Sequence, residues 1–146
     1  MIRFVAGALA AIVVTGTAQA ALSPTDIVNR HTSSGGNIDA IMADYADDAI
    51  VLQAGKAYQG KAEIRPLFEK MFAGRPAAPA PSPGAPPAAR PAGGMKVTKV
   101  WQEGDVGLMT WTAGPMSATE EFLVRDGKIK VQAIFLSRTP DAAPAK

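Results

Sequence analysis

The chain has 146 residues, with fifteen Lys and Arg against thirteen Asp and Glu, and no cysteine. This length suits one domain with one core. Without cysteine, packing alone must stabilise the domain, and thiolate metal sites are excluded. The near balance of charge, with no basic cluster, argues against a nucleic-acid partner. We also expect no metal and no cofactor.

The first twenty residues have the pattern of a signal peptide. Arg3 precedes an apolar run over residues 4–14, and Ala18-Gln19-Ala20 is a small-x-small cleavage motif. The alternative is a membrane anchor, but Thr15 and Gly16 end the run before the roughly 20 apolar residues that span a bilayer. We expect export to the periplasm or the medium, cleavage after Ala20, and no membrane contact of the mature chain.

The rest of the chain predicts one α+β domain over residues 21–137, followed by a flexible tail at 138–146. Periodicity and caps predict helices over about 24–34, 37–45 and 61–72. Pro66 should make the third helix start late or bend. Strands are expected at 49–53, near Tyr58, and at 95–103, 106–113, 116–125 and 128–137, with Asp126-Gly127 as a two-residue hairpin turn. Asp47-Asp48 is expected to end the second helix in a capping or turn role, rather than to bind metal.

Residues 73–94 are almost entirely Pro, Ala and Gly. They show no apolar periodicity, so the segment is expected to be a disordered or polyproline-like insert. A docking arm for an aromatic groove is the less favoured alternative, because proline-rich linkers are common.

The hairpin turn gives a register for the last two strands. Counting from Arg125 opposite Lys128 places Val124 opposite Ile129, Phe122 opposite Val131, Glu120 opposite Ala133 and Ala118 opposite Phe135, all on one apolar face. The same count places Gln132 on the other face. Glu120 is therefore predicted to be partly desolvated, which raises the pKa of a carboxyl group. It lies either at a sheet margin or at the mouth or floor of a ligand pocket.

His31, the only histidine, follows Ile27 by four residues and can share the buried stripe of the first helix. It is then either a core or rim residue or a catalytic base. Trp101 and Trp111 fall on opposite faces of their hairpin, so at most one of them should line a pocket.

Three segments carry a family resemblance. Residues 45–51 (YADDAIV), 60–65 (GKAEIR) and 125–129 (RDGKI) look like the SnoaL-like branch of the nuclear transport factor 2 (NTF2-like) superfamily. The resemblance covers Asp26 to Ser137 except the insert. It implies a cone-shaped half-barrel in which a curved, mostly antiparallel sheet wraps three N-terminal helices and encloses an apolar pocket. It also implies dimerisation through the sheet.

The same resemblance includes ketosteroid isomerases, whose catalytic pattern is retained only in part. Gln53 stands where those enzymes have the proton-shuttling carboxylate, and glutamine cannot take a proton. Glu120 falls at their protonated oxyanion-hole acid. Their tyrosine would fall near Asn29 to His31, where this chain has none. Classical isomerase activity is therefore not expected.

The sequence leaves three functions open. The first is an exported domain that binds a small apolar or amphipathic molecule. Its expected pocket residues are Glu120 as a polar anchor and Tyr45, Phe68, Met71, Trp101, Trp111, Phe122 and Phe135 as walls. The second is a cofactor-independent isomerase, hydratase, dehydratase or hydrolase in which Glu120 and His31 transfer protons. The third is a non-catalytic module that forms a homodimer through its sheet.

Overall fold

The computed structural model describes residues 22–74 and 94–138. The predicted signal peptide, nearly all of the Pro/Ala-rich insert and the tail after Arg138 lie outside the described residues, so those predictions stay untested. The elements are, in chain order, α1 (Pro24–Ser33), α2 (Ile38–Asp44), β1 (Tyr45–Gln53), β2 (Lys56–Gln59), α3 (Gly60–Met71), β3 (Lys96–Glu103), β4 (Val106–Ala113), β5 (Met116–Arg125) and β6 (Lys128–Arg138).

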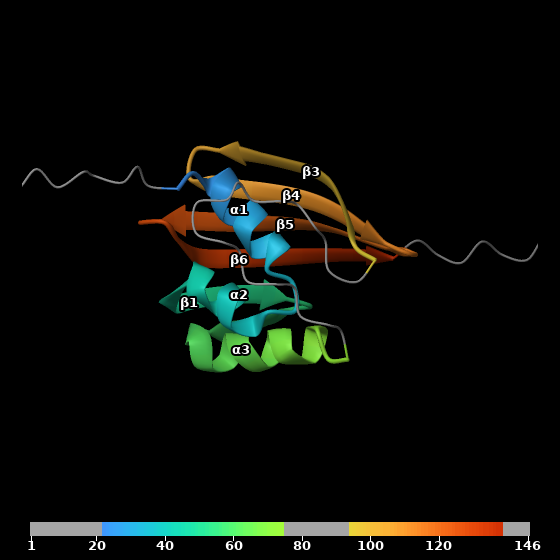
Figure 1. Ribbon diagram of the computed structural model, residues 1–146, viewed down its shortest axis with the longest axis horizontal. Coiled ribbons are helices and arrows are strands. Elements are labelled where there is room, and N and C mark those ends of the chain that lie inside the picture. Colours follow the sequence, from blue (N-terminus) through green and yellow to red (C-terminus); the bar gives the residue numbers. More distant parts are fainter. Residues whose placement is uncertain (1–21, 75–93, 139–146) are drawn as a thin grey trace, which may run out of the picture.

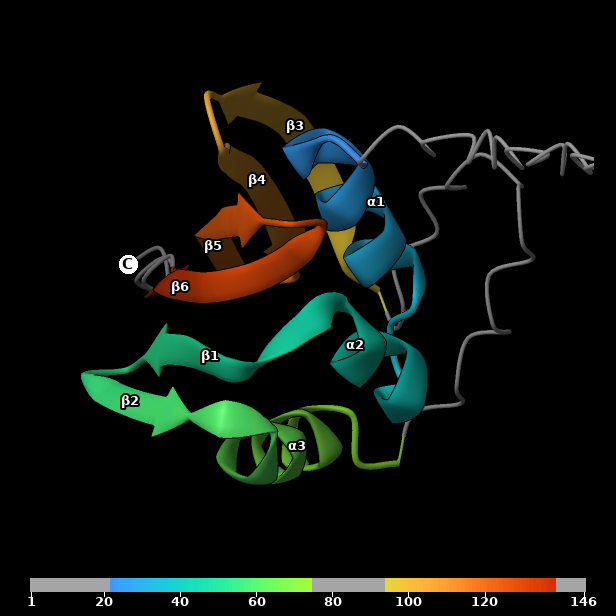
Figure 2. The ribbon, with the colours of Figure 1, turned by 90° about the vertical axis from the view of Figure 1, so that its left-hand side faces the viewer.

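The six strands form one mixed sheet in the order β2-β1-β6-β5-β4-β3. All neighbouring strands are antiparallel except β1 and β6, which run parallel. The sheet curls without closing, and the three helices lie against its concave side (Figures 1 and 2). The predicted α+β fold with a curved, mostly antiparallel half-barrel is confirmed.

The first two helices begin where the sequence predicts. The Ser23 hydroxyl accepts a hydrogen bond from the Asp26 backbone N–H, and the Asp26 carboxylate accepts one from the Ser23 N–H, which completes a capping box. The Asn37 side chain caps α2 through the Ala40 N–H. Gly36 follows α1 with φ +83°, a left-handed conformation that glycine adopts without strain.

The predicted start of the first strand was wrong. The strand β1 begins at Tyr45, before Asp47 and Asp48, so these carboxylates lie on a strand. There they pair with lysines on neighbouring elements, Lys61 at 2.8 Å and Lys130 at 2.8 Å. Strand pairing with β6 therefore overrides the predicted turn role.

The third helix, predicted over 61–72, runs from Gly60 past Pro66 to Met71, so only the late start was wrong. Pro66 stands in the second turn, where its missing N–H removes one helical hydrogen bond. Ile64 and Phe68 are buried on either side of it. Their packing holds this part of the helix in place, so the helix does not start late.

The predicted register of β5 and β6 was wrong beyond the first two pairs. Arg125 pairs with Lys128 and Val124 with Ile129 as predicted, but a bulge between Leu123 and Val124 then shifts β6 by one residue. A one-residue shift exchanges the two faces of a strand. Phe122 is therefore opposite Gln132, Glu120 opposite Ile134 and Ala118 opposite Leu136. Gln132 faces the core, and Phe135 faces outward with 56% of its surface exposed.

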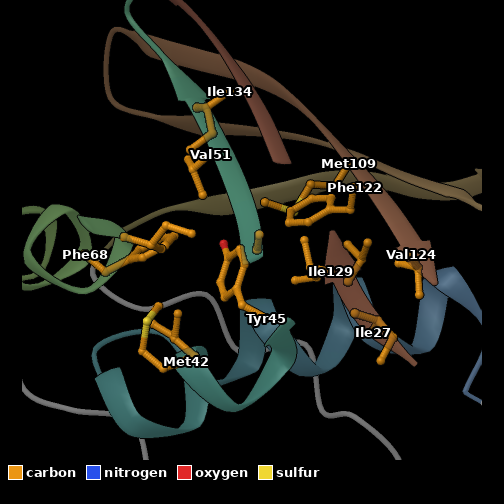
Figure 3. Close-up of a cluster of buried hydrophobic side chains, with 14 of the residues drawn as sticks. Ile27, Met42, Tyr45, Val51, Phe68, Met109, Phe122, Val124, Ile129 and Ile134 are labelled. Atoms are coloured by element: carbon orange, nitrogen blue, oxygen red, sulfur yellow. The ribbon is translucent and has the colours of Figure 1, made fainter. Parts of the chain in front are cut away.

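The core packs between the helices and the sheet. Figure 3 shows Tyr45 standing between Phe68 of α3 and Phe122 of β5. The side chains of Tyr45 and Phe122 are fully buried, as are Ile27, Ile41, Ile64 and Ile129. Within residues 22–74 and 94–138, none of the helices is long and apolar enough to cross a membrane.

The approach of α1 to the sheet depends on Gly107 of β4. A Cβ atom at this position would lie 2.6 Å from Val28 Cγ2 and 2.9 Å from the Pro24 carbonyl oxygen. The backbone contact cannot be relieved by a side-chain rotation. We predict that Gly107→Ala lowers the free energy of unfolding by about 1–3 kcal/mol, the usual cost of overpacking. Denaturant unfolding measures this loss, and Thr112→Ala, at an exposed site on the same strand, is the control. Equal stability of the two variants would contradict the close approach.

Candidate functional site: a cavity inside the cone

The concave side of the sheet encloses a cavity of about 170 Å³. Its walls come from α1, α2, α3 and the inner faces of β1, β4, β5 and β6, and they are mostly apolar. The lining residues include Ile41, Phe68, Met71, Phe72, Met95, Met109, Trp111, Met116, Ile134 and Leu136. Five further side chains with polar groups, those of His31, Thr32, Gln53, Glu120 and Gln132, also face it. An apolar cavity with a few converging polar groups is the usual form of a small-molecule site.

Glu120 is the acidic residue of this cavity and is 7% exposed. Its two oxygens have separate donors on the strands either side of β5. The Trp111 indole N–H of β4 donates to Oε1 at 2.6 Å, and the Gln132 amide of β6 donates to Oε2 at 2.6 Å. Gln132 Oε1 in turn accepts a hydrogen bond from the Tyr45 hydroxyl. A line of buried hydrogen bonds therefore runs from Tyr45 through Gln132 and Glu120 to Trp111.

Burial raises the pKa of Glu120 above its usual value, and the hydrogen bonds from Trp111 and Gln132 oppose that rise. Burial also raises the pKa of Tyr45 well above 10, with smaller contributions from the charges of Glu120 and Asp44. Tyr45 is thus a neutral hydrogen-bond donor. Glu120 takes up a proton more readily than a solvated carboxyl group does. A raised pKa of this kind suits a general acid, and it also suits a polar group that anchors a ligand.

His31 faces the same cavity from α1 and is 6% exposed. Its ring makes edge contacts with Tyr45, Phe68 and Phe122 at centroid distances of 5.5, 5.7 and 5.5 Å. Desolvation, with a smaller effect of the Arg30 charge, lowers the pKa of His31 to about 4. The imidazole is therefore neutral at neutral pH, and neutral imidazole can act as a base or as a hydrogen-bond acceptor.

Asp44, the last residue of α2, lies behind His31. Its Oδ2 is 3.9 Å from His31 Nδ1, and its Oδ1 is 2.5 Å from Arg30 Nε. Asp44 is 1% exposed. Burial raises the pKa of Asp44, and the charge and hydrogen bond of Arg30 oppose that rise.

The predicted site residues divide into three groups. Glu120, His31, Phe68, Met71 and Trp111 line the cavity together. Tyr45 and Phe122 are fully buried behind that lining. Trp101 and Phe135 are on the other face of the sheet, where Lys99 Nζ lies 4.4 Å from the Trp101 ring centroid and Phe135 lines a shallow outer groove beside Leu52. The separation of the two tryptophans onto opposite faces agrees with the predicted count.

Sequence reasoning missed Gln132 and Asp44. Gln132 was placed on the wrong face, because no feature of the sequence indicates the β6 bulge. Asp44 is the buried carboxylate nearest the predicted YADDA junction, and a signal was present: it stands three residues after Ile41, on the same side of the helix. Within the described part of the chain, no cluster of three His, Asp or Glu side chains could hold a metal ion.

No model of a known protein family matches the sequence, and no curated protein matches it. Several solved structures, however, are similar to the structure of this chain. An NTF2-like protein of unknown function from Burkholderia xenovorans is 24% identical, with a TM-score of 0.55 over 82% of this chain and 85% of that one. A putative polyketide cyclase from Sinorhizobium meliloti is 21% identical, with a TM-score of 0.56 over 75% and 93%. A putative ketosteroid isomerase from Kribbella flavida is 17% identical, with a TM-score of 0.54 over 84% of each chain.

These similarities establish the fold. The chain has the NTF2-like fold shared by SnoaL-like polyketide cyclases and ketosteroid isomerase-like proteins, as the sequence motifs imply. The fold serves many unrelated activities, so activity must be argued from the cavity itself.

The low pKa of His31 predicts a pH dependence of stability. The unfolded chain, in which histidine titrates near 6.5, binds a proton more tightly than the folded chain, in which the value is about 4. The contribution of the neutral His31 to the unfolding free energy is therefore fully present above pH 6.5 and is lost as pH falls through 4. We expect the difference in unfolding free energy between the wild type and His31→Gln to fall by at most about 3 kcal/mol between pH 7 and pH 4. Urea unfolding across this range measures it. A difference that stays constant with pH would show that His31 is solvated.

Proposed function

We propose that this chain is an exported domain that binds a compact, mostly apolar molecule in the cavity and holds its polar group against Glu120. The observation that carries the proposal is a buried carboxyl group, tied to Trp111 and Gln132, that faces an otherwise apolar cavity. Burying a carboxyl costs stability, and residues kept at such a cost concentrate at functional sites. Export rests on the signal-peptide pattern before Ala21.

The cavity volume limits the size of the ligand. An engineered apolar cavity of roughly 150 Å³ binds benzene, and this cavity, at about 170 Å³, is similar. The ligand is therefore about the size of a substituted benzene ring or a small terpenoid fragment. Methionines at 71, 95, 109 and 116 line the walls, and their flexible side chains can adapt to different apolar shapes.

Classical isomerase chemistry does not fit these residues. Although one structural neighbour is a putative ketosteroid isomerase, Gln53 lines the cavity where the resemblance places the proton-shuttling carboxylate. An amide cannot accept and return a proton at neutral pH. The binding function is therefore preferred to that activity.

One observation favours an enzyme as the second candidate. His31 and Glu120 line the same small cavity from opposite elements, the helix α1 and the strand β5. A neutral imidazole and a carboxyl group with a raised pKa form a base and acid pair suited to proton transfer, hydration or dehydration. Such a reaction needs no cofactor.

The third candidate, a homodimer through the sheet, draws on the outer sheet face. Leu52 and Phe135 are 42% and 56% exposed there and border the same shallow groove. Exposed apolar side chains that gather on one face are typical of association surfaces. We predict dimers in sedimentation velocity, and a shift towards monomer in Phe135→Lys. A wild type that stays monomeric at high concentration would exclude this interface.

A filled cavity should abolish binding. Trp101→Phe leaves Trp111 as the one tryptophan, and its indole reports on the cavity. In this background we predict that toluene or acetophenone changes the Trp111 emission saturably, and that Ala113→Leu, which adds a side chain to the cavity wall, removes the response. The neighbouring Thr112→Leu, at an exposed site on the other face, is the matched control and should retain it. If the Trp101→Phe background and its Thr112→Leu variant bind no small apolar probe, the binding function is contradicted.

A further inference from the structure

We propose that Asp44 is a positioning residue that fixes the tautomer of His31, so that the cavity presents a bare Nε2 acceptor and selects ligands with an O–H or N–H donor. The inference rests on the proposed binding function and specifies the ligand class of the same cavity. It combines a buried pair of polar atoms with the placement of the histidine in the cavity wall.

The two atoms concerned lack other partners. His31 Nδ1 and Asp44 Oδ2 are the buried side-chain polar atoms without a hydrogen bond in the described part of the chain. They face each other at 3.9 Å. Buried polar atoms are almost always satisfied, and the separation of this pair exceeds an ordinary hydrogen bond by only about 1 Å. Each atom is thus the natural partner of the other.

The rest of the site determines which atom carries the proton. The ion pair with Arg30, whose Nε lies 2.5 Å from Asp44 Oδ1, identifies Asp44 as a carboxylate. Burial raises the pKa of Asp44, and the charges of Arg30 and Lys128 oppose that rise. A carboxylate can only accept hydrogen bonds, so Nδ1 of the neutral imidazole must be the protonated nitrogen. The other nitrogen, Nε2, then has a free lone pair, as in other histidines whose second nitrogen is oriented by a carboxylate.

The cavity therefore offers two different polar groups to a ligand. His31 Nε2 accepts a hydrogen bond from a donor group, while the Glu120 carboxyl on the sheet is the second polar contact. Apolar walls surround both of them. A compact hydroxyl-bearing aromatic or alicyclic molecule fits this combination, and phenol is the simplest probe of the class.

Nuclear magnetic resonance tests the tautomer directly. His31 is the only histidine of the chain, so its imidazole nitrogens are assigned without ambiguity. Long-range ¹H–¹⁵N correlation at pH 7 should show the Nδ1–H tautomer in the wild type. Asp44→Asn should convert it to Nε2–H, since the carboxamide can donate to Nδ1. Asp39→Asn, which changes an exposed carboxylate of the same helix and leaves Arg30 and Asp44 intact, should remain Nδ1–H. An Nε2–H tautomer in the wild type overturns the proposal, including in the case that Asp44→Asn does not fold.

Ligand selection is the second readout. The wild type and Asp39→Asn should bind phenol more tightly than toluene, and Asp44→Asn should lose about tenfold of that preference, the effect of one hydrogen bond. If all three proteins bind both probes with the same preference, the tautomer proposal fails and the binding function stands. If neither probe binds to the wild type, the binding function itself fails.

Discussion

The site depends on one physical constraint, the need to satisfy a carboxyl group buried in an apolar cone. Glu120 lies on the inner face of the central strand β5, where water cannot solvate it. Two N–H donors from the flanking strands compensate for the lost water, one from Trp111 and one from Gln132. An unsatisfied carboxyl there would cost several kcal/mol or more. The position of β6 therefore has to deliver the Gln132 amide to the inner face.

The β6 bulge provides that position. Without it, the alternation of the hairpin would place Gln132 in solvent and Phe135 against the helices. With it, Phe135 is exposed, and the amide joins a line of hydrogen bonds that reaches Tyr45. The cavity is thus a consequence of irregular pairing: a strand that could have filled the cone with an aromatic ring contributes polar groups instead. Bulges often have this effect beside functional sites.

Much of the fold was predictable from local signals. The Ser23 and Asn37 caps, the Asp126-Gly127 turn and the burial of Glu120 follow from short-range chemistry, and the structure agrees with each of them. The register of β6 was not predictable, because a bulge is a tertiary feature with no residue signature here. The start of β1 at Tyr45 was not predictable either, since pairing with β6 decides it.

The same division applies to the site. Glu120 and His31 could be identified as candidates because each is an ionisable residue at an apolar position of its element. Their partners could not be identified from the sequence in this way. Gln132 depends on the bulge, and Asp44 depends on the packing of α1 against α2, which brings residues 31 and 44 together. Periodicity can place a residue on a face, but it cannot show which side chains meet across two elements.

The most direct test of the account is a titration of the Glu120 carboxyl carbon by NMR in the chain from Ala21 onward, with and without acetophenone. A buried anchor should titrate well above the ordinary value near 4.3, and its midpoint should move when the ligand enters the cavity. An ordinary midpoint that the ligand leaves unchanged would show that Glu120 is solvated, and would contradict both the binding function and its enzymatic alternative.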